Sequence, residues 1–196
     1  MKTLFSSRTH YINGTLQTAP LLLARQLKKL LSGHDLPTAP PIFVCIGSDR
    51  VTGDSLGPLV GTSLAHSPYF PYSVYGTLRH PVHALNLGTA VCEIQQRHPH
   101  NPVIAIDASL GSRHHQRYIT IAPGSIAPGS GVDKELPAIG DIAITGIINT
   151  MGDYPQMLLQ TTRLSVVMEL ANCITHGILL ASGCLDETEC AVHYRQ

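Results

Sequence analysis

The chain has 196 residues and an apolar share of 43%, which suffices for one domain with a sizeable core. Lys and Arg number 13, as do Asp and Glu, and this balance excludes the basic surface typical of nucleic-acid-binding proteins. Charged residues make up only 13% of the sequence, about half of the usual share near 25%, which indicates a surface partly covered by another copy in a homo-oligomer.

The amino-terminal segment lacks the continuous apolar core of a secretory signal, and no stretch approaches the roughly 20 apolar residues of a membrane span. Five cysteines occur without a CxxC pair, which favours reduced thiols. We therefore expect a soluble, cytoplasmic protein with neither membrane nor nucleic acid as a partner.

The amino-terminal third predicts an arm, two helices and two strands. Residues 1–14 are expected to be irregular and residues 21–31 to form an amphipathic helix, so that 1–40 is an arm and helix ahead of the sheet. An apolar run at 42–46 predicts a buried strand, which turns through glycines and small polar residues into a helix ending near residue 65. A second strand is predicted at 72–77.

The remaining elements complete an α/β pattern. We expect a helix over 82–96, a buried parallel strand that starts at Val103 and ends at Asp107, an antiparallel strand over 117–121, a strand over 141–148 and a long closing helix over 158–180. Residues 181–196 are predicted to be a loose tail. This order predicts one domain over 1–196, a three-layer α/β/α sandwich with a mixed, mainly parallel sheet.

Two aspartates follow buried strands of this predicted sheet. Asp54 lies in the turn after the first strand, and Asp107 ends the apolar run that starts at Val103. Because carboxyl ends of neighbouring parallel strands meet at one edge of a sheet, we expect the two carboxylates to share a site. The alternative for Asp54 is a helix N-cap, a role that aspartate fills well.

Other polar residues are weaker candidates. His83 follows the second predicted strand and could face the same crevice, although a histidine there is commonly a surface or capping group. The glycine-rich loop 122–132 could point successive backbone amides at an anion. His114 and His115 are expected to be solvated turn residues. Two CxxH pairs, at 173–176 and 190–193, have spacings found in zinc sites, but a buried thiol suits Cys173 better.

Several ordered motifs resemble a known family. Residues 47–58 (GSDRVTGDSLGP), 106–108 (IDA) and 128–132 (PGSGV) are similar to the landmarks of the germination protease of spore-forming bacteria. The smaller sporulation proteins of the YyaC family are closer still, with further likeness at 75–77 (YGT), 81–86 (PVHALN) and 140–147 (GDIAITGI). The resemblance runs from about residue 42 to residue 175.

This resemblance implies an α/β/α sandwich shared with hydrogenase-maturation endopeptidases, and a spore-associated endopeptidase acting in the forespore or spore interior on a protein or peptide substrate. The two aspartates held responsible for cleavage in the germination protease correspond to Asp54 and Asp107. Two close carboxylates split their pKa values, so that one can accept a proton from water while the other donates one. The residues that could bind the substrate or the oxyanion are Gly129, Ser130, Gly131, Lys134 and His83.

Two other functions remain open. The chain could be a catalytically silent binding or structural protein of the spore, with the acidic pair serving as caps and acceptors. It could also be a metal-dependent maturation-type peptidase, but the histidine ligand of those relatives is replaced by TGII at 145–148. Because two carboxylates alone seldom hold a transition metal, we expect no metal or other cofactor unless His83 supplies a ligand.

Overall fold

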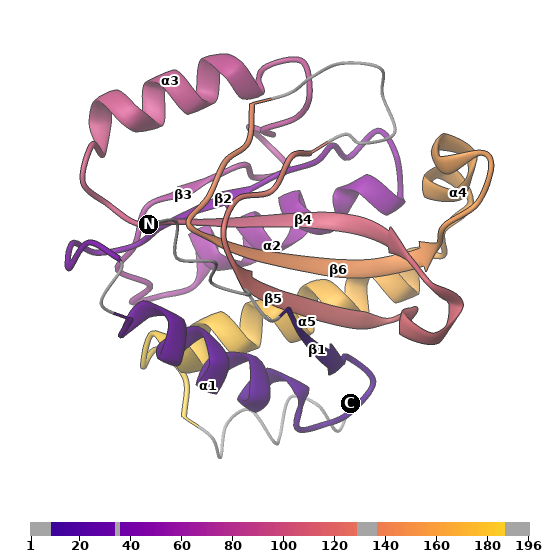
Figure 1. Cartoon of the computed structure of the whole chain (residues 1–196), viewed down its shortest axis with the longest axis horizontal. Coiled ribbons are helices and arrows are strands. Elements are labelled where there is room, and N and C mark those ends of the chain that lie inside the picture. Colours follow the sequence, from indigo (N-terminus) through magenta and orange to yellow (C-terminus); the bar gives the residue numbers. More distant parts are fainter. Residues whose placement is uncertain (1–8, 34–35, 129–136, 187–196) are drawn as a thin grey trace, which may run out of the picture.

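A six-stranded sheet forms the centre of the protein, in the spatial order β1-β5-β6-β4-β2-β3 (Figure 1). The computed structural model describes residues 9–33, 36–128 and 137–186. The strands are β1 (His10–Asn13), β2 (Ile42–Cys45), β3 (Val74–Tyr75), β4 (Val103–Gly111), β5 (Tyr118–Pro123) and β6 (Ile142–Thr150). Strands β3, β2, β4 and β6 are mutually parallel, whereas β5 runs antiparallel to both of its neighbours. The sheet is mixed and mainly parallel, as predicted.

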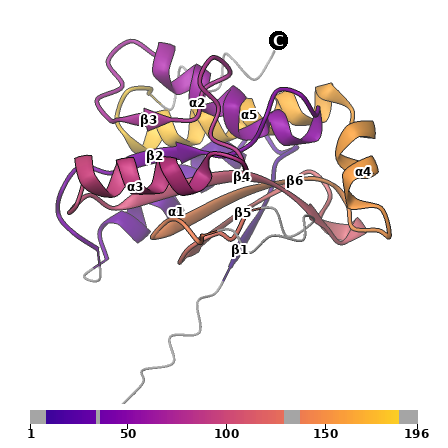
Figure 2. The same cartoon turned by 90° about the horizontal axis from the view of Figure 1, so that it is seen from above.

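Helices cover both faces of the sheet. They are α1 (Ala19–Leu31), α2 (Leu56–His66), α3 (Leu87–Arg97), α4 (Pro155–Thr161) and α5 (Leu164–Ala181), with 3₁₀ turns η1 (Gly53–Ser55) and η2 (Arg113–His115). Helices α1, α2 and α5 pack on one face and α3 covers the other (Figure 2). Helix α4 lies beyond the end of β6. This arrangement confirms the α/β/α sandwich.

Alternation along the strands divides the core into two layers. On β4, Ile104 and Ile106 face α2 and α5, while Ala105 faces α3. The layer under α1, α2 and α5 is the larger, and its fully buried side chains, such as Leu23 and Leu64, each stabilise the fold by roughly 1.5–3 kcal/mol. Most of the apolar surface is therefore buried on one side of the sheet.

Helix α2 lies unusually close to the sheet at its first turn. A Cβ atom on Gly57 would stand 2.0 Å from the carbonyl oxygen of Ile46, so that no side chain fits there. This contact sets the distance between the end of β2 and the start of α2. The turn that joins them, which carries Asp54, is held between two buried elements.

Helix α5 has the length and composition of a membrane span, with a mean hydropathy of 1.6 over 18 residues. The expectation that no stretch approaches a span is therefore wrong for this helix. Half of it is buried inside the protein, where Val167, Leu170 and Ile174 pack against α1, α2 and the sheet. Its hydropathy is that of a core helix between two others.

The structure differs from the predictions in three places: residues 10–13, the start of α3 and the position of β5 in the sheet. Residues 10–13, expected to be irregular, form β1 at the edge of the sheet, with Ile12 buried in the core. Helix α3 begins at Leu87 instead of residue 82, because the Asn86 side chain accepts a bond from the His83 N–H (2.8 Å) and donates to the Pro81 carbonyl (2.9 Å). Strand β5 is antiparallel as predicted, but β6 separates it from β4.

The predicted closing helix over 158–180 is two helices. Thr162 and Arg163 adopt extended backbone angles between α4 and α5. The Thr162 hydroxyl donates to the Leu158 carbonyl (2.7 Å), and the Asn149 side chain on β6 donates to the same carbonyl (3.1 Å). These bonds complete the end of α4 and let the chain change direction. Of the predicted tail over 181–196, residues 187–196 lie outside the described part.

Candidate functional site

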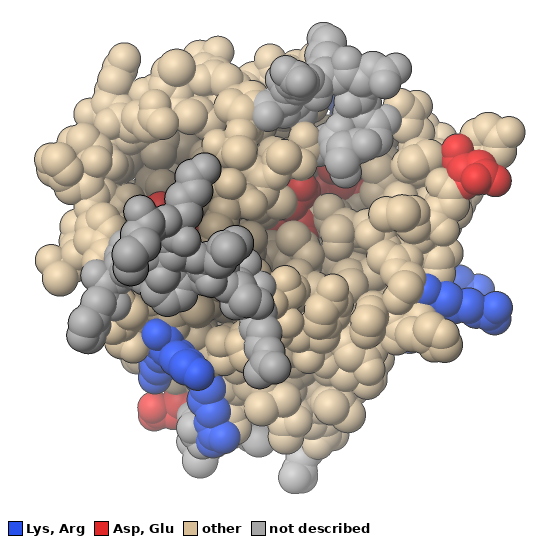
Figure 3. Space-filling view, viewed as in Figure 1, with Lys and Arg blue, Asp and Glu red and all other residues tan. Residues whose placement is uncertain are grey.

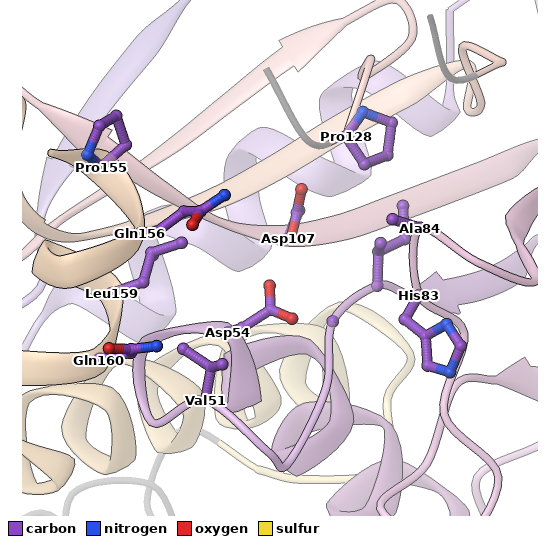
Figure 4. A pocket seen from close by; sticks show the side chains of 12 residues that line it. Val51, Asp54, His83, Ala84, Asp107, Pro128, Pro155, Gln156, Leu159 and Gln160 are labelled. Atoms are coloured by element: carbon purple, nitrogen blue, oxygen red, sulfur yellow. The ribbon is translucent and has the colours of Figure 1, made fainter. Parts of the chain in front are cut away.

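A pocket of about 280 Å³ opens just past the carboxyl end of β2, beside the middle of β4, and Figure 4 shows side chains that line it. Most of its lining is apolar or amide, and two carboxylates project into it. The lining residues are Ile46, Gly47, Val51, Asp54, His83, Ala84, Asp107, Pro128, Pro155, Gln156, Leu159 and Gln160. Seen from outside, much of the surrounding surface carries no charged side chain, and acidic atoms are visible in a recess near its middle (Figure 3).

Asp54 is presented by the 3₁₀ turn η1, between β2 and α2. After β2 the chain reverses at Gly47, and the Ser48 N–H donates to the Asp54 main-chain carbonyl (3.0 Å), which closes the turn. The N-cap residue of α2 is Ser55, and no side-chain bond caps that helix. The interpretation of Asp54 as a helix cap is therefore wrong, and its half-buried carboxylate faces the pocket.

Asp107 lies in the middle of β4 instead of at its end. The pairing of β4 with β2 stops at Ile106, whereas pairing with β6 continues to Gly111. The side chain of Asp107 therefore stands just past the end of β2, which is why it still reaches the pocket that the strand pattern predicts. It is 7% exposed, and one carboxylate oxygen accepts the Ala108 N–H at 2.8 Å.

The two carboxylates point into the same space and interact electrostatically (Figure 4). Burial raises the pKa of Asp107 well above its ordinary value, and the charge of Asp54 raises it further. Burial also raises the pKa of Asp54, against smaller lowering effects of a Ser48 backbone hydrogen bond and of His83. The pair therefore keeps one proton up to a higher pH than two separate aspartates do. Asp107, the more buried of the two, carries that proton.

His83 lines the same pocket on the side opposite α4. Its Nδ1 accepts the Leu85 N–H at 3.3 Å, and the ring is directed away from the two carboxylates. The histidine thus lies at the rim, where its charge lowers the pKa of Asp54.

The other predicted site residues, Gly129, Ser130, Gly131 and Lys134, lie outside the described residues. The residue before them, Pro128, lines the pocket.

Helix α4 supplies a wall that the sequence reasoning missed, because the pattern predicted one core helix here. Gln156, Leu159 and Gln160 share the face of α4 that lines the pocket. A sequence signal was present: Pro155 follows an exposed polar loop and occupies the first turn of α4, a usual helix start.

Metal ligands are sparse in the described part of the chain. Within residues 9–33, 36–128 and 137–186, no group of three or more His, Cys, Asp or Glu side chains is arranged to hold an ion. Cys173 is buried in α5, and the second CxxH pair, at 190–193, lies outside the described residues. His115 stacks on Tyr11 with ring centroids 4.4 Å apart, which gives it a packing role.

The fold and the pocket define an α/β/α sandwich protein with an acidic pair in a pocket just past the end of β2. Residues 14–177 match the family described as "Protein of unknown function (DUF1256)", and the chain belongs to this family. A Bacillus subtilis (strain 168) relative, described as "Uncharacterized protein YyaC", is 43% identical over 168 residues, which cover 85% of this chain and 80% of the relative. The predicted likeness to the YyaC family is confirmed, and the pocket lies inside the matched region.

Proposed function

We propose that the protein is an aspartate-dependent endopeptidase that hydrolyses a protein substrate with Asp54 and Asp107. The observation that carries this proposal is the convergence of two carboxylates with raised pKa values in one open pocket. Such a pair supplies the base and the acid that hydrolysis needs at the same pH. The spore as its setting, and kinship with the germination protease, rest on the motif resemblance alone.

The difference in burial between the two groups supports different roles for them. Asp54, the more accessible, is the ionised base that takes a proton from water as the water oxygen attacks the peptide carbonyl carbon. Asp107, the more buried, keeps its proton and donates it to the amide nitrogen as the C–N bond breaks. The products are a carboxylic acid and an amine. Asp54 then releases its proton to solvent and Asp107 takes one up, which restores the starting state of the pair.

The pocket lining favours a shared proton. Its described residues include no Lys or Arg, so none of them is a fixed cation that lowers both pKa values together. Two neighbouring carboxylates do not both ionise readily unless a cation offsets their charge. A salt link that locked both groups in the charged form would remove the acid that the reaction requires.

The experiment compares wild type, Asp54→Asn and Asp107→Asn in an extract of spores, followed by mass spectrometry of new peptide ends. We expect wild-type-dependent ends that both variants lose. Asp141→Asn is the matched control, because this exposed carboxylate also accepts a main-chain N–H, from Val103 at 2.8 Å. Cleavage by a variant that combines Asp54→Asn with Asp107→Asn overturns the proposal. Absence of cleavage by wild type indicates a binding protein, and loss of cleavage with a chelator indicates a metal-dependent enzyme.

A further inference from the structure

Two glutamines face the acidic pair from α4. Gln156 and Gln160 are one helical turn apart, and with Leu159 between them they line the pocket (Figure 4). Both are exposed at its mouth. Among the residues that the structure describes, neither side-chain amide has a hydrogen-bond partner, so each has its donors and its acceptor available to a ligand.

Helix α4 is held in place relative to Asp54. At its carboxyl end, Asn149 donates to the Leu158 carbonyl and to the Thr162 hydroxyl, at 3.1 and 3.2 Å. On its pocket side, the backbone of Leu159 lies so close to Gly53 that a Cβ atom there would stand 2.8 Å from the Leu159 carbonyl oxygen. Because Gly53 directly precedes Asp54, this contact fixes the distance between the glutamine wall and the catalytic turn.

The spacing of the two amides suits an extended peptide. Residues four apart on a helix are separated by about 6 Å along its axis. In an extended chain, peptide units that point the same way recur every two residues, or about 6.6 Å. A primary amide offers both a donor and an acceptor, which match the C=O and N–H of a peptide unit.

We infer that Gln156 and Gln160 bind the main chain of an extended substrate segment at two positions two residues apart, and so set its register over Asp54 and Asp107. This inference rests on the proposed function. The two glutamines are positioning residues, and the class of substrate is a polypeptide strand recognised through its backbone. Val51 and Pro155 also line the pocket, and these apolar residues add contact that does not depend on the charge of the substrate.

The test uses a peptide that wild type cleaves in the extract experiment, resynthesised alone and with one main-chain amide at a time N-methylated. We expect Gln156→Ala and Gln160→Ala each to raise KM about two- to tenfold with kcat little changed, the effect of one lost neutral hydrogen bond. Gln96→Ala, the same change on the exposed side of α3, is the matched control and leaves KM unchanged. Melting temperatures of all three variants should equal that of wild type.

The methylated peptides test the register. N-methylation at one position should weaken binding to wild type but not to Gln156→Ala, and methylation two residues away should behave in the same way toward Gln160→Ala. Glutamine variants that match Gln96→Ala, or sensitive positions not two residues apart, overturn this inference while the endopeptidase proposal stands. Wild type that cleaves no peptide overturns both.

Discussion

Replacement of Asp107 by Asn is expected to stabilise the protein while it abolishes hydrolysis. The substitution keeps the size of the side chain and its acceptor for the Ala108 N–H, and it removes a carboxylate that is 7% exposed. A folded-state pKa raised above the unfolded value makes folding less favourable as pH rises from the ordinary value through the folded pKa. The variant lacks this loss, so its advantage is absent near pH 4 and grows toward neutral pH.

The size of the gain follows from linkage. Each pH unit between the unfolded and folded pKa of Asp107 corresponds to about 1.4 kcal/mol at pH values above both. For a chain of this length, 1 kcal/mol shifts the melting temperature by roughly 2–4 °C. Circular dichroism melts of wild type and Asp107→Asn between pH 4 and pH 8 measure the difference directly.

A double-mutant cycle tests whether the two carboxylates interact. Because the charge of Asp54 contributes to the raised pKa of Asp107, Asp107→Asn should stabilise the Asp54→Asn background less than it stabilises wild type. An equal stabilisation by Asp107→Asn in both backgrounds would show that the two side chains do not interact. A variant no more stable than wild type at any pH would refute the assignment of a buried carboxylate with a raised pKa.

Three further predictions concern the reaction and the scaffold. The pH profile of kcat/KM should be bell-shaped, with a rise through the pKa of Asp54 and a fall through that of Asp107, both displaced above ordinary aspartate values; a flat profile contradicts the shared roles. Gly57→Ala places a Cβ 2.0 Å from a carbonyl oxygen and should lower the free energy of unfolding by about 3 kcal/mol or more in urea titrations, whereas Gly88→Ala, with nothing within 4 Å, should raise it by about 0.5–1 kcal/mol. Asn149→Ala releases the end of α4 and should cost about 1 kcal/mol of stability and slow peptide hydrolysis roughly tenfold, measured by melts and initial rates; an unchanged rate would mean that α4 does not position substrate.

The parallel strands were predictable from the sequence because their residues are apolar on both faces. The predicted strand that ends at Asp107 starts where β4 starts but stops four residues short of its end at Gly111, and the runs at 42–46 and 141–148 agree with β2 and β6 within two residues at each end. Edge strand β1 was missed because four residues with one buried side chain, Ile12, show no period. The break between α4 and α5 was missed because it depends on Asn149, which only the folded sheet brings to Leu158.

The acidic pair and the nearby His83 were predictable from the strand pattern, and the wall formed by α4 was not. The rule that parallel strands bring their carboxyl ends to one edge of the sheet predicted that Asp54 and Asp107 converge. Asp107 reaches the pocket because β4 extends past the end of β2. Nothing local in the sequence indicates that Gln156 and Gln160 lie across from them, because their place depends on the path of the chain after β6. The charged groups of the site were thus predictable from the sequence, whereas the wall of α4 that faces them was not.

The contact between α1 and α5 joins the first helix of the chain to the last one. Gly177 of α5 packs against Leu23 of α1, so the first helix to be synthesised cannot bury this surface until the last helix has been made. Without α5, the apolar side chains of the sheet that α5 covers in the folded protein would be exposed to solvent. A stop codon just ahead of residue 164 should therefore send the product to proteases instead of leaving a smaller working domain.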